Sequence, residues 1–179
     1  MNKIIAPAAL LLLLFTGCKE ATTTTAADET VVLPMETSYK GKMEIGTSAN
    51  VVTVMQWNKW LSERNLDSAF TTFADSVTID MADGTRFDLP KDSIKNVMAG
   101  WLSTMKSINI KYIAAMPLNN TTNKDEWVLS WTDESYEYND GKKEHVIIHE
   151  DYRMVNGKIR QVLQYARKLP PPPPPAPAK

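Results

Sequence analysis

The dipeptide Asn156-Gly157 constrains the fold of this chain more than any other feature. It separates two runs rich in Val, Ile, Tyr and Leu within residues 144–168. Asn-Gly favours a two-residue type I′ turn, because both central residues of that turn need a positive φ. Such a turn pairs Val155 with Lys158, and the register of the hairpin then follows by counting. The sequence therefore predicts two long antiparallel strands at the end of the domain.

Counting from this turn assigns the side chains of the hairpin to two faces. Met154 is expected opposite Ile159, and Glu150 opposite Leu163. Side chains alternate across a strand, so one face contains the core residues and the other is mostly solvated. Glu150 is expected on the core face.

A second turn at residues 140–141 (Asp-Gly) joins this hairpin to a preceding strand. If that turn also has two residues, Trp131 lies opposite Glu150. The same register places Glu137 opposite Glu144, a like-charge pair that indicates fraying or a bulge. A one-residue bulge would exchange the two faces of the strand.

The remaining elements follow from local patterns, since apolar residues at helical spacing predict helices and alternation predicts strands. In chain order, the expected elements are a helix over residues 51–61, a helix over 66–74, a strand over 75–81, a short strand over 85–88, a helix from Pro90 to Met105, and strands over 108–116 and 125–138. Helices followed by four long antiparallel strands form an α+β pattern.

The first 17 residues are expected to be a targeting segment rather than part of the fold. Residues 14–18 (LFTGC) resemble a bacterial lipobox, which implies cleavage before Cys18 and a lipid on its sulfur. The alternative is an ordinary signal peptide with a chance cysteine. Cys18 is the only cysteine, so no disulfide can form within the chain. Lys19, rather than Asp, follows it, which favours the outer membrane of the cell envelope and leaves the leaflet, periplasmic or surface-facing, open.

The domain is expected to occupy residues 49–168, between two extensions. Residues 18–48 are predicted to form a tether and an N-terminal extension, and residues 169–179 a polyproline II tail. The tail is either a stiff exposed extension or a ligand for a partner protein. The formal net charge is −1 and no basic cluster occurs, which argues against nucleic acid as a partner.

Several short motifs together resemble the nuclear transport factor 2-like superfamily, and SnoaL-like domains within it. They are residues 73–77 (FADSV), residues 83–84 (DG), the amphipathic helix that ends at Met105, and residues 156–165. The resemblance implies a cone-shaped, strongly curved, mostly antiparallel sheet wrapped over three helices (cystatin-like), with a ligand pocket and often a dimer. The superfamily includes ketosteroid isomerases, scytalone dehydratases, polyketide cyclases, epoxide hydrolases and members that only bind. The fold therefore leaves the function open.

The predicted register indicates which residues the pocket would contain. The expected lining comprises Trp101, Trp127, Trp131, Asp133, Glu150, Tyr152, Gln161 and Tyr165. Asp133 and Glu150 are the candidates for a general acid–base pair, with Cα atoms roughly 7–8 Å apart on a strand diagonal. Apolar surroundings would raise the pKa of either carboxyl group. Alternatively, both are hydrated at the cone mouth or accept hydrogen bonds from tyrosine hydroxyls.

The incomplete catalytic set favours binding of a small, largely apolar ligand in the cone, without a cofactor. The alternatives are an isomerase, dehydratase or hydrolase that uses a pocket carboxylate, and an envelope scaffold that binds partners. A zinc site at His145 and His149 is not expected, because about 13 Å separates residues four apart on a strand. Both histidines are predicted on the outer sheet face, where a homodimer contact would lie.

Overall fold

A computed structural model describes residues 34, 35, 37 and 41–170 of the chain. The chain divides into two units, residues 1–37 and residues 38–179, and the fold described below is that of the second unit. The predictions on the targeting segment, on Cys18 and on residues 171–179 lie outside the described residues.

Seven strands of this unit form one curved sheet in the order β1-β4-β5-β6-β7-β2-β3. Their bounds are β1 (Met43–Ile45), β2 (Phe73–Asp80), β3 (Arg86–Pro90), β4 (Met105–Asn120), β5 (Glu126–Tyr138), β6 (Lys143–Val155) and β7 (Lys158–Lys168). Neighbouring strands are antiparallel, except that β2 and β7 run parallel. The strand β1 lies in a segment that the sequence assigned to the N-terminal extension.

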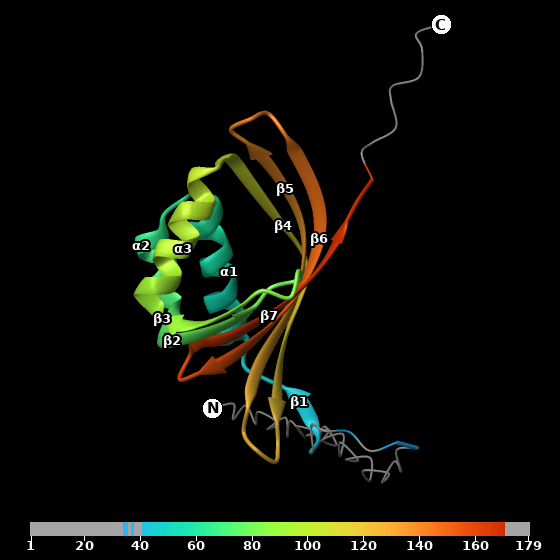
Figure 1. The fold of residues 1–179 in the computed structure, drawn as a ribbon. Helices are drawn as coiled ribbons and strands as arrows, with labels where there is room; N and C mark the ends of the chain where they lie inside the picture. Colours follow the sequence, from blue (N-terminus) through green and yellow to red (C-terminus); the bar gives the residue numbers. More distant parts are fainter. Residues whose placement is uncertain (1–33, 36, 38–40, 171–179) are drawn as a thin grey trace, which may run out of the picture. The chain divides into compact units, whose positions relative to one another are not determined.

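Three helices lie against the concave side of this sheet (Figure 1). They are α1 (Ser48–Ser62), α2 (Leu66–Ala69) and α3 (Lys91–Ser103), with a 3₁₀ turn, η1 (Phe70–Thr72), after α2. The predicted α+β cone, with a mostly antiparallel sheet wrapped over three helices, is confirmed. The helix predicted over residues 66–74 is shorter than expected, because the chain is already extended at Phe73. None of the helices in the described part combines the length and apolarity that a membrane-spanning helix needs.

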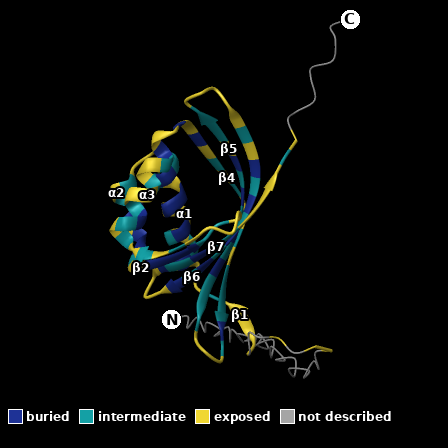
Figure 2. Cartoon of the chain, viewed as in Figure 1, coloured by how far each residue is buried: buried dark blue, intermediate teal, exposed yellow. Residues whose placement is uncertain are grey.

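The helix α1 has the start and the buried face that its sequence predicts. Thr47 is its N-cap, and its Oγ1 accepts a hydrogen bond from the Ala49 N–H at 3.3 Å. Val54, Trp57 and Leu61 are buried at helical spacing on the face toward the sheet. Buried residues line α1 and the middle strands, whereas turns and strand ends are exposed (Figure 2).

An aromatic cluster joins α1 to the beginning of β2. Trp57 packs edge-on against Phe70 and Phe73, with ring centroids 5.6 and 4.8 Å away. The rings of Phe70 and Phe73 stack with centroids 5.0 Å apart. All three side chains are buried, so the cluster fixes the position of α1 against this end of the sheet.

The β6–β7 hairpin has the predicted turn but a different register beyond it. The two turn residues, 156–157, have φ values of 51° and 71°, as a type I′ turn requires. The register then shifts by one residue at Arg160, which has no partner on β6. Glu150 therefore pairs with Gln164, and the predicted pairing with Leu163 is wrong.

The β5–β6 turn is one residue longer than predicted. A hydrogen bond from the Tyr138 N–H to the Lys142 carbonyl oxygen, 2.8 Å long, closes a three-residue turn. Gly141 ends this turn with a φ of 86°, the left-handed conformation typical of such loops. Because of the extra residue, Glu137 pairs with Lys143 and the predicted like-charge pair does not form.

Side chains alternate between the two faces of a strand, so a shift of one residue reverses which of them point into the cone. Relative to the predicted register, this reversal affects β5 and most of β7. The side chains of β5 that are buried in the cone are Val128, Ser130, Thr132 and Glu134. On β7 the buried residues are Ile159 and Val162, which alternation alone could not place on one face. The prediction for β6 was right, since Ile148, Glu150, Tyr152 and Met154 are all buried.

Gly157→Ala is expected to lower the free energy of unfolding by about 1 kcal/mol, because a Cβ atom disfavours a positive φ. An added Cβ meets no atom within 4 Å at this position, so only the backbone conformation opposes the change. Gly100 in α3 is the matched control, since it is equally open and lies inside a helix. Gly100→Ala should raise the free energy of unfolding by about 0.5–1 kcal/mol. Urea denaturation measures both, and effects of the same sign would contradict the assigned turn.

Candidate functional site

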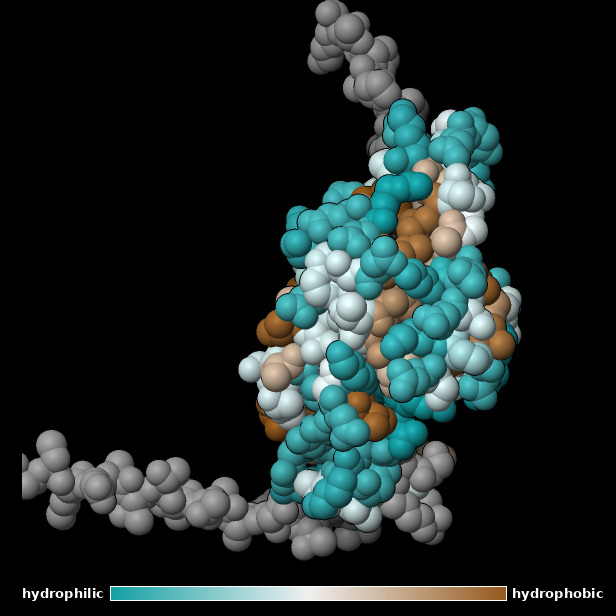
Figure 3. Space-filling model, turned by 90° about the vertical axis from the view of Figure 1, so that its left-hand side faces the viewer, coloured by the Kyte–Doolittle hydropathy of each residue, from teal (hydrophilic) through white to brown (hydrophobic). Residues whose placement is uncertain are grey.

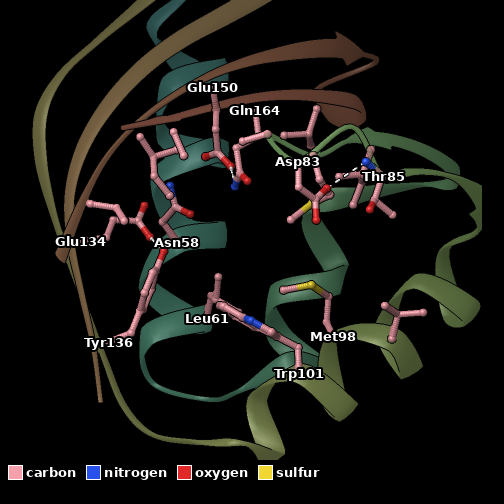
Figure 4. A pocket seen from close by; sticks show the side chains of 18 of the residues that line it. Asn58, Leu61, Asp83, Thr85, Met98, Trp101, Glu134, Tyr136, Glu150 and Gln164 are labelled. Carbon is pink, nitrogen blue, oxygen red and sulfur yellow. Dashed lines mark hydrogen bonds between the residues drawn. The ribbon is translucent and has the colours of Figure 1, made fainter. Parts of the chain in front are cut away.

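A cavity of about 470 Å³ lies between the concave sheet face and the helices α1 and α3 (Figure 4). Its lining consists of Trp57, Asn58, Leu61, Phe73, Ile79, Met81, Ala82, Asp83, Thr85, Phe87, Ile94, Val97, Met98, Trp101, Glu134, Tyr136, Tyr138, Glu144, Val146, Ile148, Glu150, Val162, Gln164, Ala166 and Lys168. Most of these side chains are apolar or aromatic. On the face seen in Figure 3, a band of apolar surface is bordered by hydrophilic residues. The volume of the cavity is in the range typical of small-molecule sites.

Glu150 lies in the middle of β6 and points into this cavity (Figure 4). Its side chain accepts hydrogen bonds from the Tyr152 hydroxyl at Oε2 and from Gln164 Nε2 at Oε1, the latter 3.1 Å long. Burial, and next the negative charge of Glu134, raise the pKa of Glu150 to about 7, against the opposing effect of the two hydrogen bonds. A carboxyl group with this pKa can both donate and accept a proton near neutral pH.

Glu134 on β5 is a second buried carboxyl group in the same cavity, with only 5% of its surface exposed. It accepts hydrogen bonds from Thr132 Oγ1 at 2.6 Å and from the Tyr136 hydroxyl. Burial raises the pKa of Glu134 above its ordinary value. The Tyr136 ring, in turn, packs edge-on against Trp101 of α3, with centroids 5.9 Å apart. The sheet and the helix thus meet at this end of the cavity.

Tyrosine hydroxyls surround the two carboxyl groups. Asn58 Nδ2 of α1 donates to the Tyr112 hydroxyl at 2.6 Å. Burial first, and the charges of Glu150 and Glu134 after it, raise the pKa of Tyr112 well above its usual range. The tyrosines therefore remain protonated at neutral pH and act as hydrogen-bond donors.

Two further carboxyl groups lie among the lining residues. Glu144 accepts a hydrogen bond from the Tyr138 hydroxyl at 2.9 Å and forms an ion pair with Lys168 Nζ at 2.7 Å. The hydrogen bond from Lys168 lowers the pKa of Glu144. Asp83, in the β2–β3 turn, accepts the Thr85 N–H at 2.8 Å, which lowers the pKa of Asp83.

The structure brings only part of the predicted lining together. Trp101 and Glu150 line the cavity, and Tyr152 is fully buried beside Glu150. The residues that do not line it are Trp127, Trp131, Asp133, Gln161 and Tyr165. The one-residue shifts at the β5–β6 turn and on β7 place these five on the other face of their strands. Asp133 therefore cannot form an acid–base pair with Glu150 inside the cavity.

The outer sheet face carries the two histidines, as predicted. His149 lies between the rings of Trp131 and Tyr165, with centroids 4.7 and 5.7 Å away. His145 Nε2 lies 2.6 Å from Asp133 Oδ1. Among the described residues, no group of three or more His, Cys, Asp or Glu side chains could bind a metal ion. The homodimer contact assigned to this face stays a prediction.

Sequence reasoning missed Glu134, Asn58 and Gln164. A signal for Glu134 was present, because the predicted pairing of Glu137 with Glu144 was unfavourable and a one-residue shift removes it. That same shift turns Glu134 inward. A signal for Asn58 was also present, because it lies four residues after Val54 and three before Leu61, on the predicted buried side of α1.

No protein-family model matches the sequence, and no curated protein matches it. Solved structures do share its fold. An LEH-like epoxide hydrolase from M. tuberculosis is 10% identical with a TM-score of 0.55, over 68% of this chain and 84% of that one. AusH from Aspergillus nidulans is 12% identical with a TM-score of 0.55, over 69% of this chain and 87% of that one.

A nuclear transport factor 2-like protein of unknown function from Burkholderia pseudomallei K96243 is 13% identical. It has a TM-score of 0.54, over 68% of this chain and 92% of the other. The expected fold resemblance is thereby confirmed at the level of tertiary structure. The chain has the nuclear transport factor 2-like fold, a curved sheet closed over three helices around a cavity.

Proposed function

We propose that the cavity binds a small, largely apolar molecule that carries one polar or charged group. The observation that carries this proposal is the lining, in which aromatic and aliphatic side chains surround two buried carboxyl groups, Glu134 and Glu150. Sites for small molecules combine a mostly apolar wall with a few placed polar groups that orient the ligand. An apolar body would contact the wall, and the polar group would lie near the two carboxyl groups.

The proposal is tested by blocking the cavity with a single side chain. Ala166 on β7 is exposed and lines the cavity, so Ala166→Trp should fill part of it without disturbing the core. The matched control is Arg167→Trp, because the next residue of a strand points to the opposite face. The neutral fluorescent probe N-phenyl-1-naphthylamine should bind the native protein and Arg167→Trp saturably. Ala166→Trp should weaken this binding by about tenfold or more, and equal binding by both variants would place the probe outside the cavity.

The second candidate function is proton-transfer catalysis, which the pKa of about 7 at Glu150 favours. A base with a pKa near the working pH is suited to abstract and return a proton. Solvent extraction and mass spectrometry of the purified protein would identify any bound compound. Turnover of that compound, reduced about 10²-fold by Glu150→Gln with binding intact, would support an enzyme.

We further propose that a lipid on Cys18 anchors the domain in the cell envelope, on the basis of the lipobox resemblance at residues 14–18. In cells fed an alkyne fatty acid, the native chain should acquire the label and Cys18→Ser should not. Labelling of both proteins to the same extent would overturn the anchor, without bearing on the cavity.

A further inference from the structure

The cavity has an excess of acidic groups that its own side chains do not neutralise. Its lining includes four carboxyl groups, on Asp83, Glu134, Glu144 and Glu150, but a single ammonium group, on Lys168. That ammonium lies 2.7 Å from Glu144 Oε1, and its side chain is 77% exposed. Among the described residues that line the cavity, none therefore provides a cation for Glu134 or Glu150.

Neutral donors hold the two buried carboxyl groups in place. Glu134 accepts hydrogen bonds from the hydroxyl groups of Thr132 and Tyr136. Glu150 accepts hydrogen bonds from the Tyr152 hydroxyl and the Gln164 side-chain amide. Each oxygen of both groups accepts one of these hydrogen bonds, and a carboxylate oxygen can accept a second. In their ionised form, both groups thus keep acceptor capacity beyond these hydrogen bonds.

The lining of the cavity is rich in aromatic side chains. The ring-bearing residues of the lining are Trp57, Phe73, Phe87, Trp101, Tyr136 and Tyr138. Aromatic faces attract organic cations through their quadrupole, and the attraction grows when the cation is removed from water. When they are ionised, the two carboxylates repel an anion, and a neutral ligand leaves their charge uncompensated.

We propose that the ligand of this cavity is a small organic cation, an amine or quaternary ammonium group on an apolar body, which lies against Glu134 and Glu150. This inference rests on the proposed function, since it names the chemical class of the molecule bound at that site. The cation supplies the charge that the lining lacks, and its apolar body contacts the ring-lined walls.

Binding of such a cation is coupled to proton release. Without a bound cation, burial favours the protonated forms of both carboxyl groups, and the charge of Glu134 adds to this effect at Glu150, whose pKa is about 7. A bound cation stabilises the ionised forms, so protons leave as it enters. The other titratable groups near Glu150 are Tyr112, Tyr136 and Tyr152, whose pKa values are raised, so they do not titrate between pH 5 and 8.

The test compares two probes of the same shape, benzyltrimethylammonium and its neutral carbon analogue neopentylbenzene. Each competes with N-phenyl-1-naphthylamine for the cavity. At pH 8 the ammonium should displace the fluorescent probe at a concentration at least about tenfold lower than the neutral analogue does. Its affinity should rise about tenfold or more between pH 5 and pH 8, as Glu150 ionises around pH 7.

Matched variants assign the preference to the buried carboxyl groups. The preference is the ratio of the concentrations at which the neutral analogue and the ammonium displace the fluorescent probe. Glu150→Gln and Glu134→Gln should each reduce this ratio toward one. Asp133→Asn removes a carboxyl group from the outer face of the same strand as Glu134. The charge of Asp133 raises the pKa of Glu134, so its removal should favour the ionised form of Glu134 and should not lower the preference for the ammonium. If a variant does not fold, calorimetry of the native protein in buffers with different ionisation enthalpies still reports proton release.

The outcomes separate this inference from the function on which it rests. If the fluorescent probe binds but the ammonium and the neutral analogue displace it equally at both pH values, the organic-cation class is wrong and the cavity remains a binding site. Stronger binding of the neutral analogue, or no proton release, would also overturn the inference. If the fluorescent probe does not bind at all, the proposed function itself fails.

Discussion

At pH 8, the variant Glu150→Gln is expected to have a free energy of unfolding about 2 kcal/mol larger than that of the native protein, whereas at pH 5 the two should be nearly equal. The folded state holds this carboxyl group with a pKa of about 7, above the ordinary value of 4.5. A raised folded-state pKa means that the folded protein binds the proton more tightly than the unfolded chain. The stabilising contribution of this proton is fully present below about pH 4.5 and is lost as the pH rises through 7.

The size of this effect follows from the same pKa. Each pKa unit corresponds to about 1.4 kcal/mol, so ionising Glu150 in the folded state costs about 3 kcal/mol. Glutamine removes this cost but weakens the hydrogen bonds from Tyr152 and Gln164, which offsets about 1 kcal/mol. Urea denaturation between pH 5 and pH 8 measures the difference.

Two controls belong to this experiment. Glu134→Gln should lower the pKa of Glu150, because the charge of Glu134 is the second cause of its elevation. The pH at which stability falls should then move downward. Glu137→Gln, at a partly exposed carboxyl group paired with Lys106, should not raise stability at pH 8. An equal pH dependence in the native protein and Glu150→Gln would show that Glu150 is not buried as described.

Phe70→Ala is expected to lower the free energy of unfolding by about 3–5 kcal/mol, the largest effect of any change considered. Phe70 is 3% exposed and contacts both Trp57 and Phe73, so its removal leaves a hole between α1 and β2. A loss of this size is a large part of the total stability of a small domain. Thermal unfolding should shift by roughly 10 °C or more.

Phe70→Leu is the matched control, because it keeps most of the volume and should cost about 1–2 kcal/mol. Phe70 does not line the cavity. Its neighbours Trp57 and Phe73 do line the cavity, so Phe70→Ala should also weaken the binding of N-phenyl-1-naphthylamine, whereas Phe70→Leu should bind the probe as the native protein does. A loss of probe binding in folded Phe70→Leu would mean that Trp57 and Phe73 need the aromatic ring of Phe70 to hold their positions in the cavity wall.

Local patterns determined which elements form and, for one strand, which way it faces. The spacing of Val54, Trp57 and Leu61 predicts α1 with its buried side, because helical periodicity depends only on neighbouring residues. Asn156 and Gly157 determine a type I′ turn, because few other residues adopt two consecutive positive φ values. The inward direction of Glu150 also follows from the alternation of β6 alone.

The tertiary structure decided which residues of the neighbouring strands meet Glu150. The sequence Asp-Gly permits both a two-residue and a three-residue turn, and the choice depends on how the strands pair. Because side chains alternate with a period of two, one extra residue at the β5–β6 turn exchanges Asp133 for Glu134 inside the cone. The bulge at Arg160 likewise puts Gln164 beside Glu150. Only the packing of the curved sheet over its helices distinguishes these registers, since each satisfies the local preferences of the chain.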